Sequence, residues 1–234
     1  MEQNTERSQK RLGSLLNGLR AAVLGANDGI VSTAGLVVGV AGATPHRETL
    51  LVAGVAGTLA GALSMAAGEY VSVSTQRDTE RAAIAHERRE LSDDPEGELE
   101  ELAGMYRERG LSEELSRRVA RELTDHDALS AHVEVELGLN RYRANPWQAA
   151  FASMFSFLLG AMIPLLAMLL SPDAWRLAVT VVAVLVATGL LGAISARMGG
   201  ALPLRAALRC VLGGSFAMLV TYTVGSLIGG LAGS

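Results

Sequence analysis

Five long runs of this sequence are almost free of charged residues, and this feature constrains the fold more than any other. Between Arg20 and Arg47 the only charged residue is Asp28, between Glu48 and Arg77 it is Glu69, and residues 144–171, 177–196 and 210–234 carry no charge. A helix needs about 20 apolar residues to cross the hydrocarbon core of a bilayer. The sequence therefore predicts an all-α membrane protein with five transmembrane helices, over residues 18–42, 50–75, 148–171, 175–196 and 207–231.

The one long polar segment, residues 76–145, separates the second predicted span from the third. It carries 18 acidic residues against 11 arginines, so it repels anionic lipid head groups and attracts cations. We expect it to form a helical, metal-binding domain inserted between two transmembrane parts, residues 18–75 and 146–234. Residues 1–17 form a short N-terminal segment before the first span.

The basic residues predict the orientation of the chain. If the N-terminus and residues 76–145 lie on the same side of the membrane, that side holds 18 of the 20 basic residues. Basic residues concentrate on the cytosolic side of membrane proteins. We therefore expect the N-terminus and the insert in the cytosol and the C-terminus outside. Residues 1–20 do not resemble a signal peptide, and a bacterial-type plasma membrane is expected, or a vacuolar membrane in a eukaryotic cell.

The insert has the signals of several short helices. Asp94 followed by Pro95 is typical of a helix start, Gly110 of a helix end, and Ser112 of a second start. The second span is expected to continue over residues 76–91, followed by helices over 95–109, 113–125 and 126–142. One face of the 95–109 helix is expected to pack inward, through Leu99, Leu102 and Tyr106.

Acidic residues in the insert repeat at a spacing of one helical turn, which places them on one face of each helix. These groups are Glu87 with Glu90, Glu98 with Glu101 and Met105, and His132 with Glu136. Carboxylates at this spacing on several helices build divalent metal sites in helical proteins. A mixture of Glu, His and Met suits borderline transition metals better than Ca²⁺ or Mg²⁺. From spacing alone a solvated, salt-bridged surface stays open, because Arg88 and Arg89 adjoin the first pair.

The two acidic residues within the predicted spans lie at the same expected depth. Asp28 is eight residues after Arg20, and Glu69 is eight residues before Arg77. At 1.5 Å per residue, each carboxylate lies about 12 Å from the inner edge of the membrane. A charge at mid-membrane costs about 2.5–3.5 kcal/mol on insertion scales, so such residues are seldom without a function.

Several neighbours support a cation site at this depth. Met65 lies one turn from Glu69 on the same helix face, and the accessory candidates are Asn27 and Ser64. A carboxylate in a low-dielectric site also holds a proton readily, so protons compete with the metal there. The alternative is a structural pair of hydrogen-bonded polar residues between two helices.

Three segments closely resemble the vacuolar iron transporter family. They are RAAVLGANDGIVSTAGLVVGVAGA in the first span, AGALSMAAGEYVSVSTQRD in the second, and VEVELGLNRYRANPWQAAFAS at the entry to the third. The resemblance implies a homodimer of five-span subunits that exchanges cytosolic Fe²⁺, and often Mn²⁺, for protons. It also implies a cytosolic helical domain that collects the metal.

The resemblance also assigns residues. Asp28 and Met65 match the metal pathway of the family, and the residues that match its cytosolic metal site are Glu87, Glu90, Glu98, Glu101 and Glu136. Two positions depart from plant members. Gly57 stands where those members have a glutamate, which Glu69 is the candidate to replace. His132 and Val133 stand where they have two methionines, and imidazole also binds Fe²⁺.

The expected function is proton-coupled export of Fe²⁺ and Mn²⁺ from the cytosol, with the metal as substrate. We expect no enzymatic activity, no prosthetic group and no nucleic-acid partner. The expected partners are the bilayer, divalent metal ions, protons and a second copy of the chain. One alternative is a membrane-anchored metal buffer or sensor. Another is a ferroxidase, although carboxylate di-iron sites use Glu-x-x-His motifs that this sequence lacks.

Overall fold

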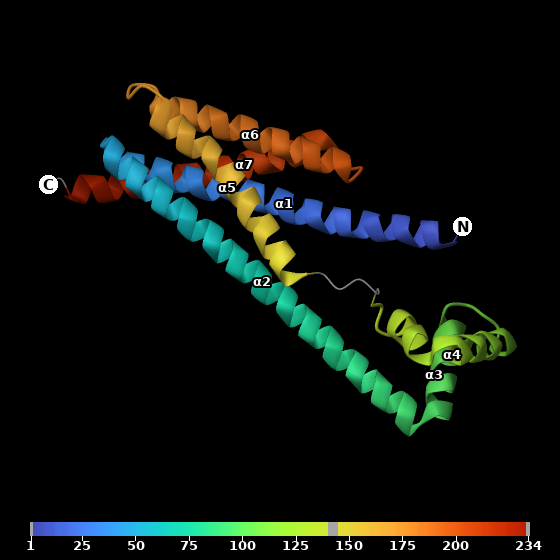
Figure 1. Ribbon diagram of the computed structural model, residues 1–234. Coiled ribbons are helices and arrows are strands. Elements are labelled where there is room, and N and C mark those ends of the chain that lie inside the picture. The colour runs from blue at the N-terminus through green and yellow to red at the C-terminus, as the bar shows by residue number, and fades with distance from the viewer. Residues whose placement is uncertain (1, 140–144, 233–234) are drawn as a thin grey trace. The chain divides into compact units, whose positions relative to one another are not determined.

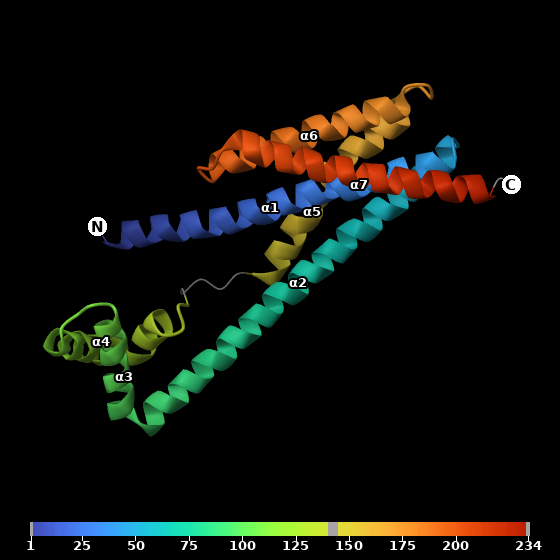
Figure 2. The same ribbon diagram turned by 180° about the vertical axis from the view of Figure 1, so that it is seen from behind.

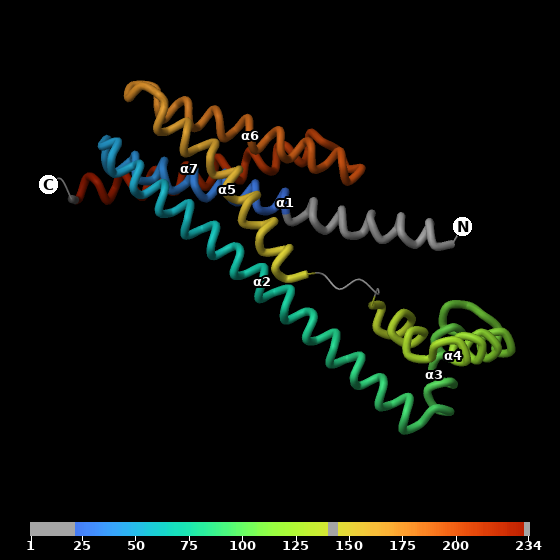
Figure 3. Tube along the Cα trace, in the orientation of Figure 1, coloured from blue at the N-terminus to red at the C-terminus, as the bar shows by residue number. Residues whose placement is uncertain are grey.

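The computed structural model describes residues 2–139 and 145–232, with side chains for 22–139 and 145–231 (Figure 3). This part of the chain contains seven helices and no strand. The helices are α1 (Glu2–Ala43), α2 (Arg47–Asp93), α3 (Pro95–Glu108), α4 (Glu113–Val135), α5 (Pro146–Leu170), α6 (Arg176–Met198) and α7 (Pro203–Ala232). Five of them, α1, α2, α5, α6 and α7, have stretches long and apolar enough to cross a membrane. The prediction of an all-helical chain with five candidate spans is therefore confirmed.

The chain divides into two compact units. Residues 1–71 together with 146–234 form the first unit, and residues 72–145 form the second. Helix α2 contributes its apolar part to the first unit and its charged last turns to the second.

Helix α1 is the central element of the first unit and packs against α5, α6 and α7 (Figures 1 and 2). Its contact with α5 depends on glycine. A Cβ atom on Gly29 would overlap the carbonyl group of Phe157, and one on Gly160 would overlap the carbonyl group of Ala26. Small residues let membrane helices approach until their backbones touch. The backbones of α1 and α5 are therefore in direct contact on either side of Asp28.

Two arginines tie the loops together at one end of the first unit. Arg47 donates to two backbone carbonyls at the end of α5, at 3.0 and 2.8 Å, and to Asp173 at 2.8 Å. Arg176 is only 8% exposed, lies 2.6 Å from the same carboxylate, and donates to the carbonyl of Pro45 at 3.0 Å. These contacts fix the start of α2 to the loop between α5 and α6.

The second unit follows the helix signals of the sequence closely. Asp94 accepts a hydrogen bond from the amide of Gly97 at 3.0 Å, with Pro95 in the first turn of α3. Gly110 follows this helix with a φ of 96°, a conformation that favours glycine. Ser112 caps α4 by accepting from the amide of Leu115 at 3.4 Å. The predicted caps are confirmed.

The predicted start of a new helix near residue 126 is confirmed by the structure, but its predicted end at residue 142 is wrong. Helix α4, Glu113–Val135, consists of two helical segments that meet at Asp127, whose backbone is not helical (φ −164°, ψ 90°). The Asp127 carboxylate accepts from the amide of Ser130 at 3.1 Å, which restarts the helix as an N-cap does. Gly138, with a φ of 60°, follows the helix end, and residues 140–142 lie outside the described residues.

Leu102 is central to the packing of the second unit, since it is fully buried between α3 and α4. The predicted inward face of α3 is confirmed, because Leu99 and Tyr106 pack against the same core. We expect Leu102→Ala to lower the unfolding free energy of this unit by about 2–5 kcal/mol, because it leaves a cavity. Hydrogen exchange of residues 95–135 measures this loss. Leu115→Ala, at a position 39% exposed, is the control, and an equal loss there would contradict the assignment.

Candidate functional site

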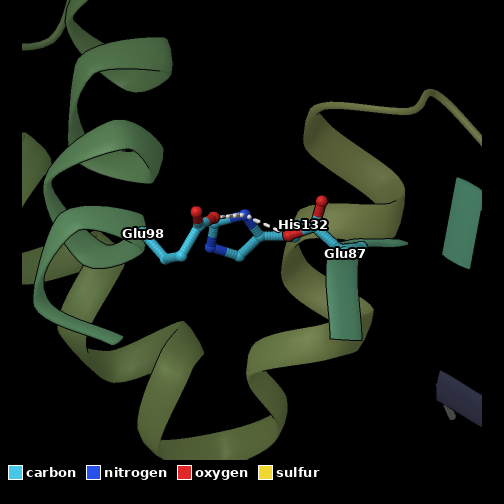
Figure 4. Close-up of side chains that lie close together, drawn as sticks. All are labelled: Glu87, Glu98 and His132. Carbon is cyan, nitrogen blue, oxygen red and sulfur yellow. Dashed lines mark ion pairs between the residues drawn. The ribbon is translucent and has the colours of Figure 1, made fainter. Parts of the chain in front are cut away.

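Three side chains of the second unit come together at a distance suited to one metal ion. Glu87 lies near the end of α2, Glu98 in the first turn of α3 and His132 in the last turn of α4. One ligand atom of each lies within 4.8 Å of the others. Figure 4 shows the imidazole ring reaching toward both carboxylates, with the ion pairs as dashed lines. Three separate helices therefore supply one cluster.

The distances centre on one nitrogen atom. The Nδ1 atom of His132 lies 2.9 Å from Glu87 Oε1, 3.5 Å from Glu98 Oε2 and 3.4 Å from Glu136 Oε2. Glu136 thus joins the three side chains from the end of α4, and we call these four residues the acidic cluster. The side chains of His132 and Glu87 are 0% and 2% exposed. The cluster is closed to solvent on that side and open near Glu136, which is 29% exposed.

Two polar atoms of the acidic cluster are buried without a hydrogen-bond partner among the described residues. They are His132 Nε2 and Glu87 Oε1. The Glu87 Oε1 atom lies close to His132 Nδ1, but the pair lacks the geometry of a hydrogen bond. A buried polar atom left unsatisfied costs about 1–3 kcal/mol. Unsatisfied nitrogen and oxygen atoms in a carboxylate-rich pocket fit a bound transition-metal cation, because it binds both types of ligand.

Mutual repulsion and burial shift the proton affinities of these carboxyl groups. Burial, a hydrogen bond to Glu136 and the charges of neighbouring glutamates raise the pKa of Glu87 to about 7. Burial, followed by the charge of Glu101, raises the pKa of Glu98. Without a cation, the folded cluster therefore holds protons that ordinary carboxylates lose, and a divalent metal ion would take their place.

We expect metal affinity of the acidic cluster to fall as the pH is lowered from about 8 to about 6. Glu87 has a pKa of about 7, so below that pH a cation must displace its proton, which costs up to about tenfold in affinity per pH unit. Cobalt titration of the full chain in detergent, followed by visible absorption, measures this. Glu87→Gln, which cannot release a proton, should flatten the dependence. An affinity independent of pH would contradict the expected competition.

The other predicted ligands of the insert are not among the four residues of the acidic cluster. Glu90 is 43% exposed and lies 3.5 Å from the exposed His86, and Glu101 is exposed. Met105 is half-buried. The charges of Glu90 and Glu101 act on the cluster, since they help to raise the pKa values of its carboxyl groups. Their role as ligands stays a prediction.

A salt-bridged surface also exists, and it involves residues other than those of the acidic cluster. Its members are Arg107 and Arg117 with Glu100 and Glu113. Among the described residues, Glu87 pairs with His132 and not with Arg88 or Arg89. The salt-bridged surface and the candidate metal site therefore involve different glutamates of the insert.

The first unit contains a cavity of about 280 Å³ at the meeting of α1, α2 and α5. Its polar lining comes from Asp28, Ser32, Thr33 and Ser64, and Met65 adds a thioether. The Ser32 hydroxyl donates to the backbone carbonyl of Asp28 at 2.6 Å. The cavity thus places a carboxylate, a sulfur atom and hydroxyl groups together within otherwise apolar helices.

The cavity joins three of the membrane residues that the sequence singled out: Asp28, Met65 and Ser64. Glu69 is half-buried and Asn27 has a buried, unpaired Oδ1 atom, but neither lines the cavity in the part of the chain described. That Glu69 is the partner of Asp28 stays a prediction.

The lining residues Ser32, Thr33 and Phe157 were not predicted as metal ligands. Ser32 lies four residues after Asp28 on the same face of α1, so helical spacing indicated it. Thr33 shares the run that contains Asp28 but lies at a spacing that gives no such signal. Phe157 comes from α5, far along the chain, and nothing in the sequence pairs it with α1.

Comparison with known proteins gives a consistent result over most of the chain. The sequence model of the VIT family matches residues 19–226. A vacuolar iron transporter of Acanthamoeba castellanii is 42% identical over 95% of this chain and 82% of its own length. Vacuolar iron transporter homolog 1 of Oryza sativa subsp. japonica is 40% identical over 90% of this chain and 74% of its own length. Vacuolar iron transporter homolog 3 of Arabidopsis thaliana is 37% identical over 90% of this chain and 83% of its own length. The chain belongs to the VIT family.

Proposed function

We propose that this protein transports divalent transition metals, Fe²⁺ and Mn²⁺ among them, out of the cytosol in exchange for protons. The observation that carries the proposal is the cavity that holds Asp28 and Met65 together among apolar helices. A carboxylate within a membrane span is costly and marks an ion pathway by default. The relatives named vacuolar iron transporters support a metal cargo.

The ligand types favour transition metals over Ca²⁺ and Mg²⁺. Asp28 supplies a hard oxygen and Met65 a soft sulfur, a combination that suits borderline divalent cations. Ser64 adds a hydroxyl group to the same cavity, and Glu69 and Asn27 are further candidates from the same two helices.

Proton coupling follows from the chemistry of one carboxylate in a site of low polarity. Asp28 can hold a metal ion or a proton, and binding of one releases the other. If the site opens to one side of the membrane at a time, each metal ion that leaves lets a proton enter in the opposite direction. A proton gradient then drives the metal.

The acidic cluster would collect metal on the cytosolic side. The distribution of basic residues supports a cytosolic N-terminus, a cytosolic insert over residues 76–145 and an external C-terminus. A homodimer is part of the proposal on the strength of the resemblance alone. The membrane is the plasma membrane in a bacterium or the vacuolar membrane in a eukaryote, and no enzymatic step is needed.

Reconstitution into proteoliposomes tests the proposed function. Under anaerobic conditions, Fe²⁺ should accumulate in vesicles with an acidic interior, and a protonophore should stop the uptake, because it removes the driving force. Stoichiometric metal binding without uptake would instead identify a buffer or sensor. Oxygen consumption on addition of Fe²⁺ would identify a ferroxidase.

A further inference from the structure

A pair of buried threonines lies beyond Asp28 along the cavity. Thr33 is five residues further along α1, which is about 7.5 Å at 1.5 Å per residue. It lines the cavity and is 2% exposed. Its Oγ1 atom lies 3.4 Å from Oγ1 of Thr58, which comes from α2 and is 5% exposed. Two hydroxyl groups from two helices therefore meet next to the cavity.

The cavity closes with apolar groups immediately past this pair. Its lining continues to Leu36 and Gly57, where an added Cβ on the glycine would overlap the leucine side chain. One turn further along α2, a Cβ on Gly54 would lie 2.6 Å from Leu165 Cδ1 and 3.1 Å from Val37 Cγ1. Among the described lining residues, Thr33 is thus the last polar side chain before the closure.

The hydroxyl groups are only weakly engaged with each other. Hydrogen bonds between hydroxyl oxygens are usually about 2.5–3.0 Å long, and this one is 3.4 Å. Thr33 lines the cavity, so its Oγ1 atom keeps lone pairs that can turn toward a cation there, while Oγ1 of Thr58 lies 3.4 Å from it and outside the lining.

We propose that Thr33 and Thr58 form a second, uncharged oxygen site for the divalent cation, about one and a half turns beyond Asp28. This inference rests on the proposed transport function. A cation that stays on a carboxylate moves on slowly, whereas a pathway needs sites weak enough to release the ion. The neutral hydroxyl oxygens receive the cation from Asp28. They hold it next to Leu36 until the apolar contacts of Leu36 with α2 open.

A purely structural hydrogen bond between α1 and α2 is the competing explanation, because hydroxyl groups commonly link membrane helices. The two explanations differ in what they predict for isosteric variants. A structural pair affects thermal stability and leaves the transport rate of the folded protein intact. A cation site affects the rate of metal movement.

The test compares Thr33→Val and Thr58→Val with the parent chain in the proteoliposome assay. Each valine keeps the shape and removes the hydroxyl group. We expect the maximal Fe²⁺ flux of each variant to fall about tenfold, equivalent to about 1.4 kcal/mol in the barrier, with a small change in KM. Thr33→Ser, which keeps the oxygen, should restore flux to about half of the parent value or more. Thr223→Val is the control, since its exposed hydroxyl donates within α7 to the carbonyl of Leu219 at 2.8 Å.

Retention of more than half of the parent flux by either valine variant would overturn the proposal, as would a serine variant as slow as the valine variant. Size-exclusion chromatography and melting temperature report whether each variant is folded. If Thr33→Val fails to fold, Thr58→Val and Thr33→Ser decide. A parent chain without flux would reject the transport function itself, together with this inference. Active parent and valine variants of equal rate would reject the threonine site alone.

Discussion

Replacing Asp28 with asparagine is expected to reduce proton-driven metal flux to about 1% of the parent rate or less, a change equivalent to about 2.7 kcal/mol in the barrier. The substitution keeps the size of the side chain and removes its charge. An amide neither balances the charge of a divalent cation nor exchanges it for a proton. Because Asp28 is the only charged residue lining the cavity, no other described lining residue supplies that charge. Anaerobic Fe²⁺ uptake into vesicles with an acidic interior measures the effect.

Two further variants serve as the control for Asp28→Asn and as the test of its predicted partner. Glu48→Gln removes an exposed carboxylate at the start of α2 and should leave flux unchanged. Glu69→Gln tests the predicted partner, and a loss as large as that of Asp28→Asn would assign both carboxylates to the pathway. Cobalt binding by the insert should be the same in all three proteins. Flux above about a tenth of the parent rate in Asp28→Asn would contradict the proposed role.

The second large effect is expected at His132. His132→Ala should weaken metal binding by the insert about 100-fold, or about 2.7 kcal/mol, because it removes the nitrogen around which the acidic cluster is arranged. Cobalt absorption measures both the affinity and the loss of a nitrogen ligand. Flux should fall less, since the membrane cavity is intact.

Matched variants of α4 separate ligand loss from helix damage. His126 is exposed on the same helix, so His126→Ala should bind cobalt as the parent does. His132→Met replaces the imidazole with a thioether, and it should recover part of the affinity with a preference for softer metals. Equal binding by His132→Ala and His126→Ala would show that the imidazole is not a ligand.

Much of the fold was predictable because its signals are local. The apolar runs indicated five spans, and Asp94, Gly110 and Ser112 indicated the helix boundaries of the insert. The acidic cluster was predictable in part, since one-turn spacing placed His132 beside Glu136. Spacing did not indicate which glutamates lie at the centre, because that depends on how three helices meet. Glu87 is buried there while Glu101 faces solvent.

The membrane cavity was predictable only along single helices. Periodicity grouped residues of α1 and residues of α2, and the common depth of Asp28 and Glu69 suggested a pair. The cavity brings Asp28 together with Met65 and Ser64, as the sequence suggested, and the packing of α1 against α2 and α5 selects the rest of its lining. The threonine pair depends on the same packing, because Thr33 and Thr58 belong to different helices. No pattern within one helix reports such a contact.

The glycine contact between α1 and α5 has a consequence for how the cavity changes shape. With Gly29 against Phe157 and Gly160 against Ala26, one wall is a pair of backbones with no slack between them. Helix α2 forms the opposite wall. Its Gly54, Gly57 and Gly61 are contacted by the side chains of Leu36 and Val37 from α1 and of Leu165 and Phe157 from α5. Side chains change rotamers far more easily than packed backbones separate. A change in the shape of the cavity is therefore expected to come from movement of α2, while α1 and α5 stay packed against each other.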